Sequence, residues 1–263
     1  MPYFRHDNIE TYYETAGSGH SFFLLHGLGN NMRQVKAMYR PVENIQYVFM
    51  DQRGHGQSNS DGDYRFDTLV NDVIALADHL EIKGFAIGGI SMGAAVSLAT
   101  YFRYPDRVRG LFLIRNAWAG QPMNDENRKL FEALATGLSL NSKEYLLNSD
   151  IYKNTEKEAP QKAASMLSLY DEPVSVKYWQ KFSAVPKQKP FESLDDLGKI
   201  TVPVTILAND YDDIHPFESG VLIHQAIPQS KFYPIACKAL NKDQYHKDIG
   251  DHLEEFFKEV YLM

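Results

Sequence analysis

The stretch FAIGGISMGAAVSLA, Phe85 to Ala99, decides the fold of this 263-residue chain. Its first half is apolar and rich in glycine, which is typical of a short buried strand, and its second half has the spacing of an amphipathic helix. Ser91 stands at the junction, with Gly89 and Gly93 two residues to either side. We expect the serine to occupy a sharp, strained turn that lifts its hydroxyl out of the sheet, and the glycines to avoid collisions with neighbouring backbone.

The pattern G-x-S-x-G by itself also fits a flexible turn, because glycine and serine are common residues. Its surroundings favour the strand-to-helix interpretation. Unbroken apolar runs, which suit strands covered on both faces, alternate with helical stripes through the first 115 residues. This alternation predicts an α/β fold with an open, mostly parallel sheet. The strand runs cover residues 21–25, 47–50, 85–88 and 110–114, and the clearest helical stripe covers 66–80.

The pattern changes after residue 115. Residues 116–191 contain helix-like pieces without a good strand pattern, and strands resume with VPVTIL at 202–207. We therefore predict a core formed by residues 1–118 and 192–263, with a helical cap inserted at 119–191. A terminal helix with Ile249, Leu253 and Phe257 on one face is expected to complete the core.

Composition and charge restrict the partners. The formal net charge is −7 and no run of basic residues is present, so neither nucleic acid nor an anionic membrane surface is an expected partner. No apolar stretch is long enough to span a bilayer. The single cysteine, Cys237, cannot form an internal disulfide, and the charged first residues do not resemble a signal peptide, which favours a cytoplasmic location. The sequence makes no prediction of oligomeric state.

Three short segments carry a resemblance to a known family. They are His26-Gly27-Leu28-Gly29 after an early strand, DQRGHGQS from Asp51 to Ser58, and the serine pentapeptide 89–93. In this order they resemble the HGxG, D-x-R-G-x-G-x-S and nucleophile-elbow segments of the α/β-hydrolase superfamily. The resemblance implies a central sheet flanked by helices, a cap after the sixth strand and Ser91 as nucleophile. An architectural role is expected for the Asp51–Ser58 loop.

The resemblance further implies an acid after the next-to-last strand, because the family order is serine, acid, histidine. The family has an aspartate four residues before a proline at this place, which points to Asp212 ahead of Pro216. Asp210 and Asp213 in the same loop stay open as alternatives.

The base implied by the resemblance is His246, which we expect just ahead of the terminal helix. An orienting carboxylate and a histidine are what activate a serine hydroxyl. His215, His224 and His252 also lie in this part of the chain, but in positions that fit the family order less well.

The oxyanion donors implied by the resemblance are the backbone N–H groups of Leu28 and Met92. This chemistry needs neither a metal ion nor an organic cofactor. The sequence contains no H-E-x-x-H pattern, no P-loop and no dinucleotide fingerprint. We therefore predict a site built from protein groups without a cofactor.

The predicted reaction is acyl transfer to water through an acyl-enzyme on Ser91. The aromatic residues of the cap favour a small-molecule acyl substrate that is uncharged or partly apolar. Trp118, which follows the last strand before the cap, is the candidate for substrate contact. The leading function is a serine esterase or lactonase. A C–C bond hydrolase, a thioesterase, an acyltransferase and a non-catalytic small-molecule receptor stay open.

Overall fold

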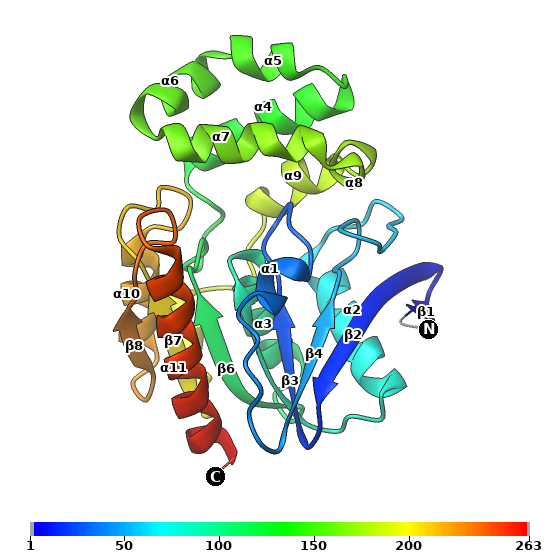
Figure 1. Ribbon diagram of the computed structural model, residues 1–263, viewed down its shortest axis with the longest axis vertical. Coiled ribbons are helices and arrows are strands. Elements are labelled where there is room, and N and C mark those ends of the chain that lie inside the picture. The colour runs from blue at the N-terminus through cyan, green and yellow to red at the C-terminus, as the bar shows by residue number, and fades with distance from the viewer. Residues whose placement is uncertain (1–2, 262–263) are drawn as a thin grey trace.

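The computed structural model describes residues 3–261, which contain a sheet of eight strands (Figure 1). The strands are β1 (Tyr3–His6), β2 (Ile9–Gly17), β3 (His20–Leu25), β4 (Ile45–Met50), β5 (Phe85–Ile90), β6 (Val108–Ile114), β7 (Val204–Ala208) and β8 (Lys231–Pro234). Their spatial order is β1-β2-β4-β3-β5-β6-β7-β8. β2 pairs antiparallel with β1 and β4, and the pairings among β3 to β8 are parallel. The predicted α/β fold with a mostly parallel sheet is confirmed.

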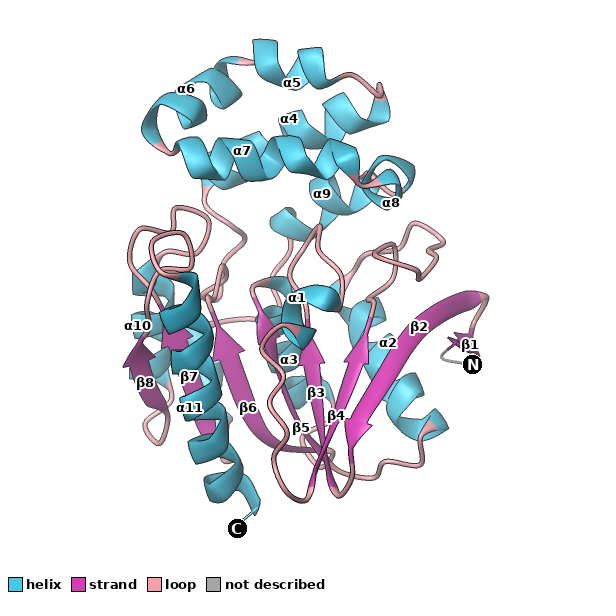
Figure 2. Cartoon of the chain, in the orientation of Figure 1, coloured by secondary structure: helices cyan, strands magenta, loops and turns pink. Residues whose placement is uncertain are grey.

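Helices cover both faces of the sheet (Figure 2). They are α1 (Arg33–Lys36), α2 (Phe66–His79), α3 (Met92–Arg103), α10 (Phe217–Ala226) and α11 (Lys242–Tyr261). Side chains alternate along β3, so Phe22 and Leu24 pack with α1 and α11, whereas Phe23 and Leu25 pack with α2, α3 and α10. Because both faces are buried, the strands have continuous apolar sequences.

The inserted residues form a group of helices beyond the carboxyl ends of the strands (Figure 1). They are α4 (Asp125–Ser139), α5 (Lys143–Asn148), α6 (Asp150–Glu158), α7 (Pro160–Ser168), α8 (Pro173–Lys177) and α9 (Gln180–Ala184). A short 3₁₀ turn at Leu169–Asp171 lies between α7 and α8, and two more follow α9 at Val185–Lys187 and Leu194–Lys199. Leu130 and Leu134 of α4 and Phe182 of α9 belong to the same buried cluster as residues of β5 and β6. The insertion is therefore packed onto the core by apolar contact.

The terminal helix α11 begins earlier than the sequence analysis expects. The Asn241 side chain accepts a hydrogen bond from the Gln244 N–H at 3.0 Å, and its carbonyl accepts one from the Tyr245 N–H at 3.0 Å. Asn241 therefore caps the helix, and the prediction that His246 precedes it is wrong, because His246 lies inside it. Within residues 3–261, no helix combines the length and hydrophobicity that crossing a membrane requires.

Candidate active site

The serine elbow has the strained geometry predicted for it. Ser91 follows β5 with φ 56° and ψ −111°, a conformation that costs about 1–3 kcal/mol in a non-glycine residue. Its N–H donates to the Ile114 carbonyl of β6 at 3.0 Å. A Cβ on Gly89 or Gly93 would lie 2.4 or 2.3 Å from the Leu25 carbonyl oxygen. Both flanking positions must be glycine because the neighbouring strand leaves no room.

The segment His26–Gly29 lies beside this elbow and leaves one N–H free. A Cβ on Gly27 would lie 3.5 Å from the Ser91 Cβ, so the two backbones are in contact. The Gly27 N–H donates to Gln34 Oε1 at 2.8 Å, and the Gly29 N–H donates to His55 Nε2 at 3.1 Å. Leu28 lies between these two glycines, and its N–H has no acceptor among the hydrogen bonds of residues 3–261. The N–H of Met92 has none there either. These two groups are therefore available to a developing oxyanion.

Two buried histidines hold this segment in place as neutral acceptors. Burial lowers the pKa of His26 to about 4, and His26 Nε2 accepts the Gln52 N–H at 3.0 Å. Burial also holds the pKa of His55 well below its ordinary value. The bond from Gly29 to His55 was not foreseen in the sequence, because it joins two loops across the site.

The Asp51–Ser58 loop is architectural, as expected. Asp51 accepts the Met32 N–H and the Gln57 N–H, each at 2.8 Å. Arg53 forms two hydrogen bonds of 2.6 Å with the buried carboxylate of Asp72 in α2. The loop therefore fastens the oxyanion segment to the core.

Asp212 lies after β7, and its carboxylate is paired with the side chains of His215 and Arg115. Its Oδ1 is 2.8 Å from His215 Nδ1, and its Oδ2 accepts the Arg115 Nε–H at 2.5 Å. Burial raises the pKa of Asp212, but the charges and hydrogen bonds of His215 and Arg115 outweigh burial and lower it below its ordinary value. Asp210 and Asp213, the alternatives in the same loop, form no ion pair within the described residues.

His215 is buried against Asp212, and its ring geometry selects one tautomer. Nδ1 lies 2.8 Å from the Asp212 carboxylate and 3.2 Å from Arg115 Nη2. When the proton is on Nδ1, the ring donates the shorter, charge-assisted hydrogen bond to Asp212. The lone pair is then on Nε2. Burial lowers the pKa of His215, with Asp212 opposing that shift and Arg115 adding to it. The imidazole is therefore neutral at pH 7, with Nε2 able to accept a proton.

His246 lies apart from this pair. It is half-buried in the second turn of α11, and its ring centroid is 5.6 Å from that of Tyr245. Partial burial lowers its pKa, followed by the charges of Lys238 and Lys242. Among residues 3–261 it forms no hydrogen bond with Asp212 or Ser91. The structure joins Asp212 to His215, and the role of His246 as base stays a prediction.

Arg115 is the main site residue that the sequence analysis missed. Ile90 and Ile114 are paired in register on β5 and β6, so Ser91 and Arg115 leave neighbouring strands side by side. Arg115 has a φ of 52°, which is uncommon for a long side chain. Its guanidinium reaches across to the loop after β7 that carries Asp212. Arg115 thus connects the end of β6, the strand next to that of the serine, to the loop that carries Asp212.

A cavity of about 770 Å³ opens between the insertion and the core at this end of the sheet. It is lined by residues 158–162 and Ser165 on the insertion side, and by the loops after β7 and β8 on the core side, with Arg115 and Asp212 at its wall. Trp118 is not among its lining residues; it is 2% exposed and packs edge to face on Phe66 at 5.7 Å. Trp118 therefore serves core packing, and its contact with substrate stays a prediction.

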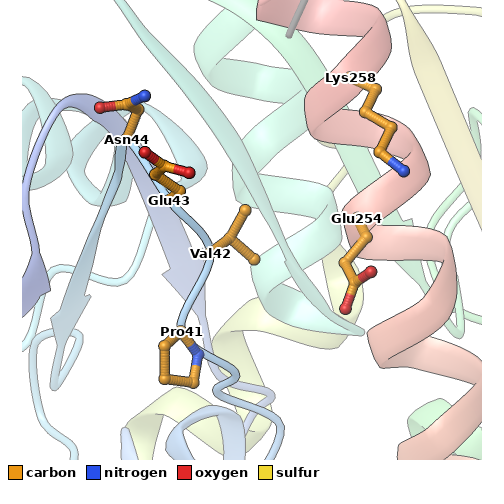
Figure 3. Close-up of a pocket in the computed structure, with 6 residues that line it drawn as sticks. All are labelled: Pro41, Val42, Glu43, Asn44, Glu254 and Lys258. Atoms are coloured by element: carbon orange, nitrogen blue, oxygen red, sulfur yellow. The ribbon is translucent and has the colours of Figure 1, made fainter.

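A smaller hollow of about 360 Å³ lies between the loop before β4 and the later turns of α11 (Figure 3). Glu254 and Lys258 project into it from α11, opposite Glu43 (Figure 3). Among the residues that the structure describes, none of those predicted for the active site lines this hollow. No three His, Cys, Asp or Glu side chains in residues 3–261 come together as a metal site.

A serine elbow at the carboxyl edge of a mostly parallel sheet, under inserted helices, defines the class of α/β hydrolases. The family model described as alpha/beta hydrolase fold matches residues 21–238, and the chain belongs to that family. Lipase 3 of Moraxella sp. (strain TA144) is 27% identical over 248 residues, which cover 88% of this chain and 72% of that protein.

Solved structures share the fold. A thermophilic esterase from Thermogutta terrifontis matches with a TM-score of 0.75 and 21% identity, over 99% of this chain and 97% of that chain. The enol-lactonase from Burkholderia xenovorans LB400 matches with a TM-score of 0.74 and 20% identity, over 96% of this chain and 100% of that chain. These relatives and neighbours are hydrolases, and by family the chain is a hydrolase.

Proposed function

We propose that this chain is a serine hydrolase that cleaves carboxylic esters or related acyl compounds of small, partly apolar molecules. The observation that carries the proposal is the strained Ser91 backbone beside the free N–H groups of Leu28 and Met92. A raised nucleophile next to two unpaired donors is what attack on a carbonyl requires. The similarity to a lipase over 88% of the chain supports the same chemistry.

The proposed base is His215, the histidine that accompanies Asp212. Ser91 and Asp212 follow β5 and β7, which are two strands apart, or roughly 10 Å. A carboxylate and an imidazole in series span such a distance. Asp212 orients the ring through Nδ1–H, and Nε2 is the basic nitrogen.

In the proposed reaction, the Ser91 oxygen attacks the carbonyl carbon of the substrate while His215 Nε2 takes the hydroxyl proton. The carbonyl electron pair moves onto oxygen, which the N–H groups of Leu28 and Met92 stabilise. When this pair returns, the bond to the leaving alcohol breaks and the imidazolium gives the alkoxide its proton. Water then attacks the acyl-enzyme with His215 again as base, which releases the acid and restores the serine.

The test is labelling of the folded chain with a fluorophosphonate probe. We expect labelling to disappear in Ser91→Ala and to slow by about 10²- to 10⁴-fold in His215→Gln, because general base catalysis is removed. His246→Gln is the matched control and should label as fast as the parent. Slow labelling of His246→Gln beside fast labelling of His215→Gln would contradict His215 and restore His246 as the base.

One observation favours a second function, a small-molecule receptor of the same fold. Within residues 3–261 the Ser91 hydroxyl forms no hydrogen bond with a histidine, and Arg115 shares the Asp212 carboxylate. A receptor needs a pocket but no base. Absence of labelling in a folded chain that binds a small molecule saturably would support the receptor over the hydrolase.

A further inference from the structure

We propose that the cavity between the insertion and the core recognises a carboxylate group on the substrate through Arg115 and Lys238. The proposal rests on the proposed function, because it names the substrate class for the cavity that is lined by Asp212, one of the proposed catalytic residues. It also predicts binding that does not depend on turnover. The ligand class is a monocarboxylate with an apolar portion.

Arg115 keeps hydrogen-bond donors free for such a group. Its Nε and Nη2 face Asp212 and His215, and the buried Tyr245 hydroxyl also lies beside the guanidinium. Nη1 has no acceptor among the hydrogen bonds of residues 3–261. The side chain is 20% exposed and lines the cavity. The planar guanidinium is suited to carboxylate oxygens, so Nη1 offers a directed contact.

Lys238 adds a positive charge that forms no ion pair among residues 3–261. It lines the cavity from the loop after β8 and forms no ion pair or hydrogen bond within the described part of the chain. Desolvation lowers the pKa of Lys238, and the positive charges of Arg115 and Lys242 lower it further. Lys162, the other lysine of the cavity, is already paired with Glu126 at 2.7 Å.

The charges of the cavity lining disfavour a ligand with more than one negative charge. Arg115 is paired with Asp212 and Lys162 with Glu126, which leaves Lys238 as the unpaired cation of the lining within residues 3–261. Glu158 and Asp213 also line the cavity, are exposed, and form no ion pair within residues 3–261. A second negative charge on the ligand would meet these two carboxylates, so a monocarboxylate fits better than a phosphate dianion.

The mouth of the cavity supplies apolar surface. Tyr211 is 83% exposed and Leu240 is 70% exposed, and both line the cavity. Exposed side chains of this kind gain free energy when an apolar ligand covers them. Ser91 and Arg115 leave adjacent strands, which lie roughly 5 Å apart, and the Arg115 side chain extends from there toward Asp212 at the wall of the cavity.

The test compares two esters that differ in one terminal group, p-nitrophenyl hexanoate and mono-p-nitrophenyl adipate. After subtraction of spontaneous hydrolysis, we expect the parent to prefer the adipate ester in kcat/KM. Lys238→Met should lower that preference by about tenfold or more, as loss of a charge-assisted contact does. Lys238→Arg should retain it. Lys242→Met is the matched control, since it removes an equal charge from outside the cavity, and it should change the preference much less.

Titration calorimetry with hexanoate and hexanamide on Ser91→Ala separates this proposal from the hydrolase proposal. Tighter binding of hexanoate that weakens in the Ser91→Ala, Lys238→Met double variant supports the carboxylate site, even if neither ester is hydrolysed. Equal binding of hexanoate and hexanamide overturns the carboxylate site. Hydrolysis of both esters without preference overturns it as well and leaves the hydrolase standing.

Discussion

Lys181 is expected to make the stability of this protein rise between about pH 7 and pH 9. The residue lies in α9 at 0% exposure, and its Nζ donates to the Gly54 carbonyl at 2.6 Å. No carboxylate pairs with it within residues 3–261. Burial lowers its pKa from 10.5 to about 7. Between these two values the unfolded chain binds more protons than the folded one, so stability increases with pH.

The magnitude follows from the two pKa values. The cost to the folded state of burying this group is about 4 kcal/mol at pH 7 and about 2 kcal/mol at pH 9. The unfolding free energy therefore gains about 2 kcal/mol from Lys181 over this range. Lys181→Met removes the titrating group and keeps an apolar stem. It also leaves the Gly54 carbonyl without its donor, but that loss is the same at both pH values.

The assay is urea unfolding of the parent and Lys181→Met at both pH values. The free energy of the parent relative to the variant should increase by about 2 kcal/mol from pH 7 to pH 9, because other titrating groups cancel in the comparison. Lys187→Met, which changes an exposed lysine of the insertion paired with Glu132, serves as control and should show no such increase. A parent-to-variant difference that is constant with pH would refute burial of an unpaired lysine.

Three further substitutions test the site and its support. Gly93→Ala should destabilise the chain by about 3 kcal/mol or more in thermal unfolding, because the Cβ would lie 2.3 Å from the Leu25 carbonyl oxygen; an unchanged melting temperature would contradict the elbow geometry. Asp72→Asn should lower the unfolding free energy in urea by about 3–5 kcal/mol, because the buried Arg53 charge loses its carboxylate partner. A loss below about 1 kcal/mol, the value of a surface ion pair, would argue against a buried pair. Gly29→Ala should slow fluorophosphonate labelling by about tenfold through displacement of the oxyanion segment; parent-like labelling would show that this segment does not act on the oxyanion.

Much of the fold could be predicted because its elements have local signals. The strands are unbroken apolar runs and the long helices carry apolar stripes, so their order could be read from periodicity. The sequence analysis did not anticipate β1, an exposed-edge strand with alternating partial burial, or α6, whose residues are mostly polar. Neither element buries enough apolar surface to leave a clear pattern in the sequence.

The site was predictable where it depends on contiguous residues. Ser91 and its glycines lie within one pentapeptide, and the structure gives them the expected geometry. The start of α11 was also readable, because Asn241 stands three residues before Gln244 in a capping pattern that the sequence analysis overlooked. The contact of Arg115 with Asp212 was not readable. It depends on the pairing of β6 with β7 and on a positive φ, neither of which has a local sequence signal.

Backbone strain is concentrated at the carboxyl ends of three adjacent strands. Eight non-glycine residues in the described chain have positive φ, and four of them are Asp or Asn, which tolerate this conformation. Ser91, Arg115 and Tyr211 are three of the remaining four, and they follow β5, β6 and β7, which are adjacent strands. Each costs the fold about 1–3 kcal/mol, and such costs persist where the surrounding structure fixes the residue in place. The buried sheet provides that support, and the strained positions mark the ends of three adjacent strands, from the serine, through the arginine, to Tyr211 at the mouth of the cavity.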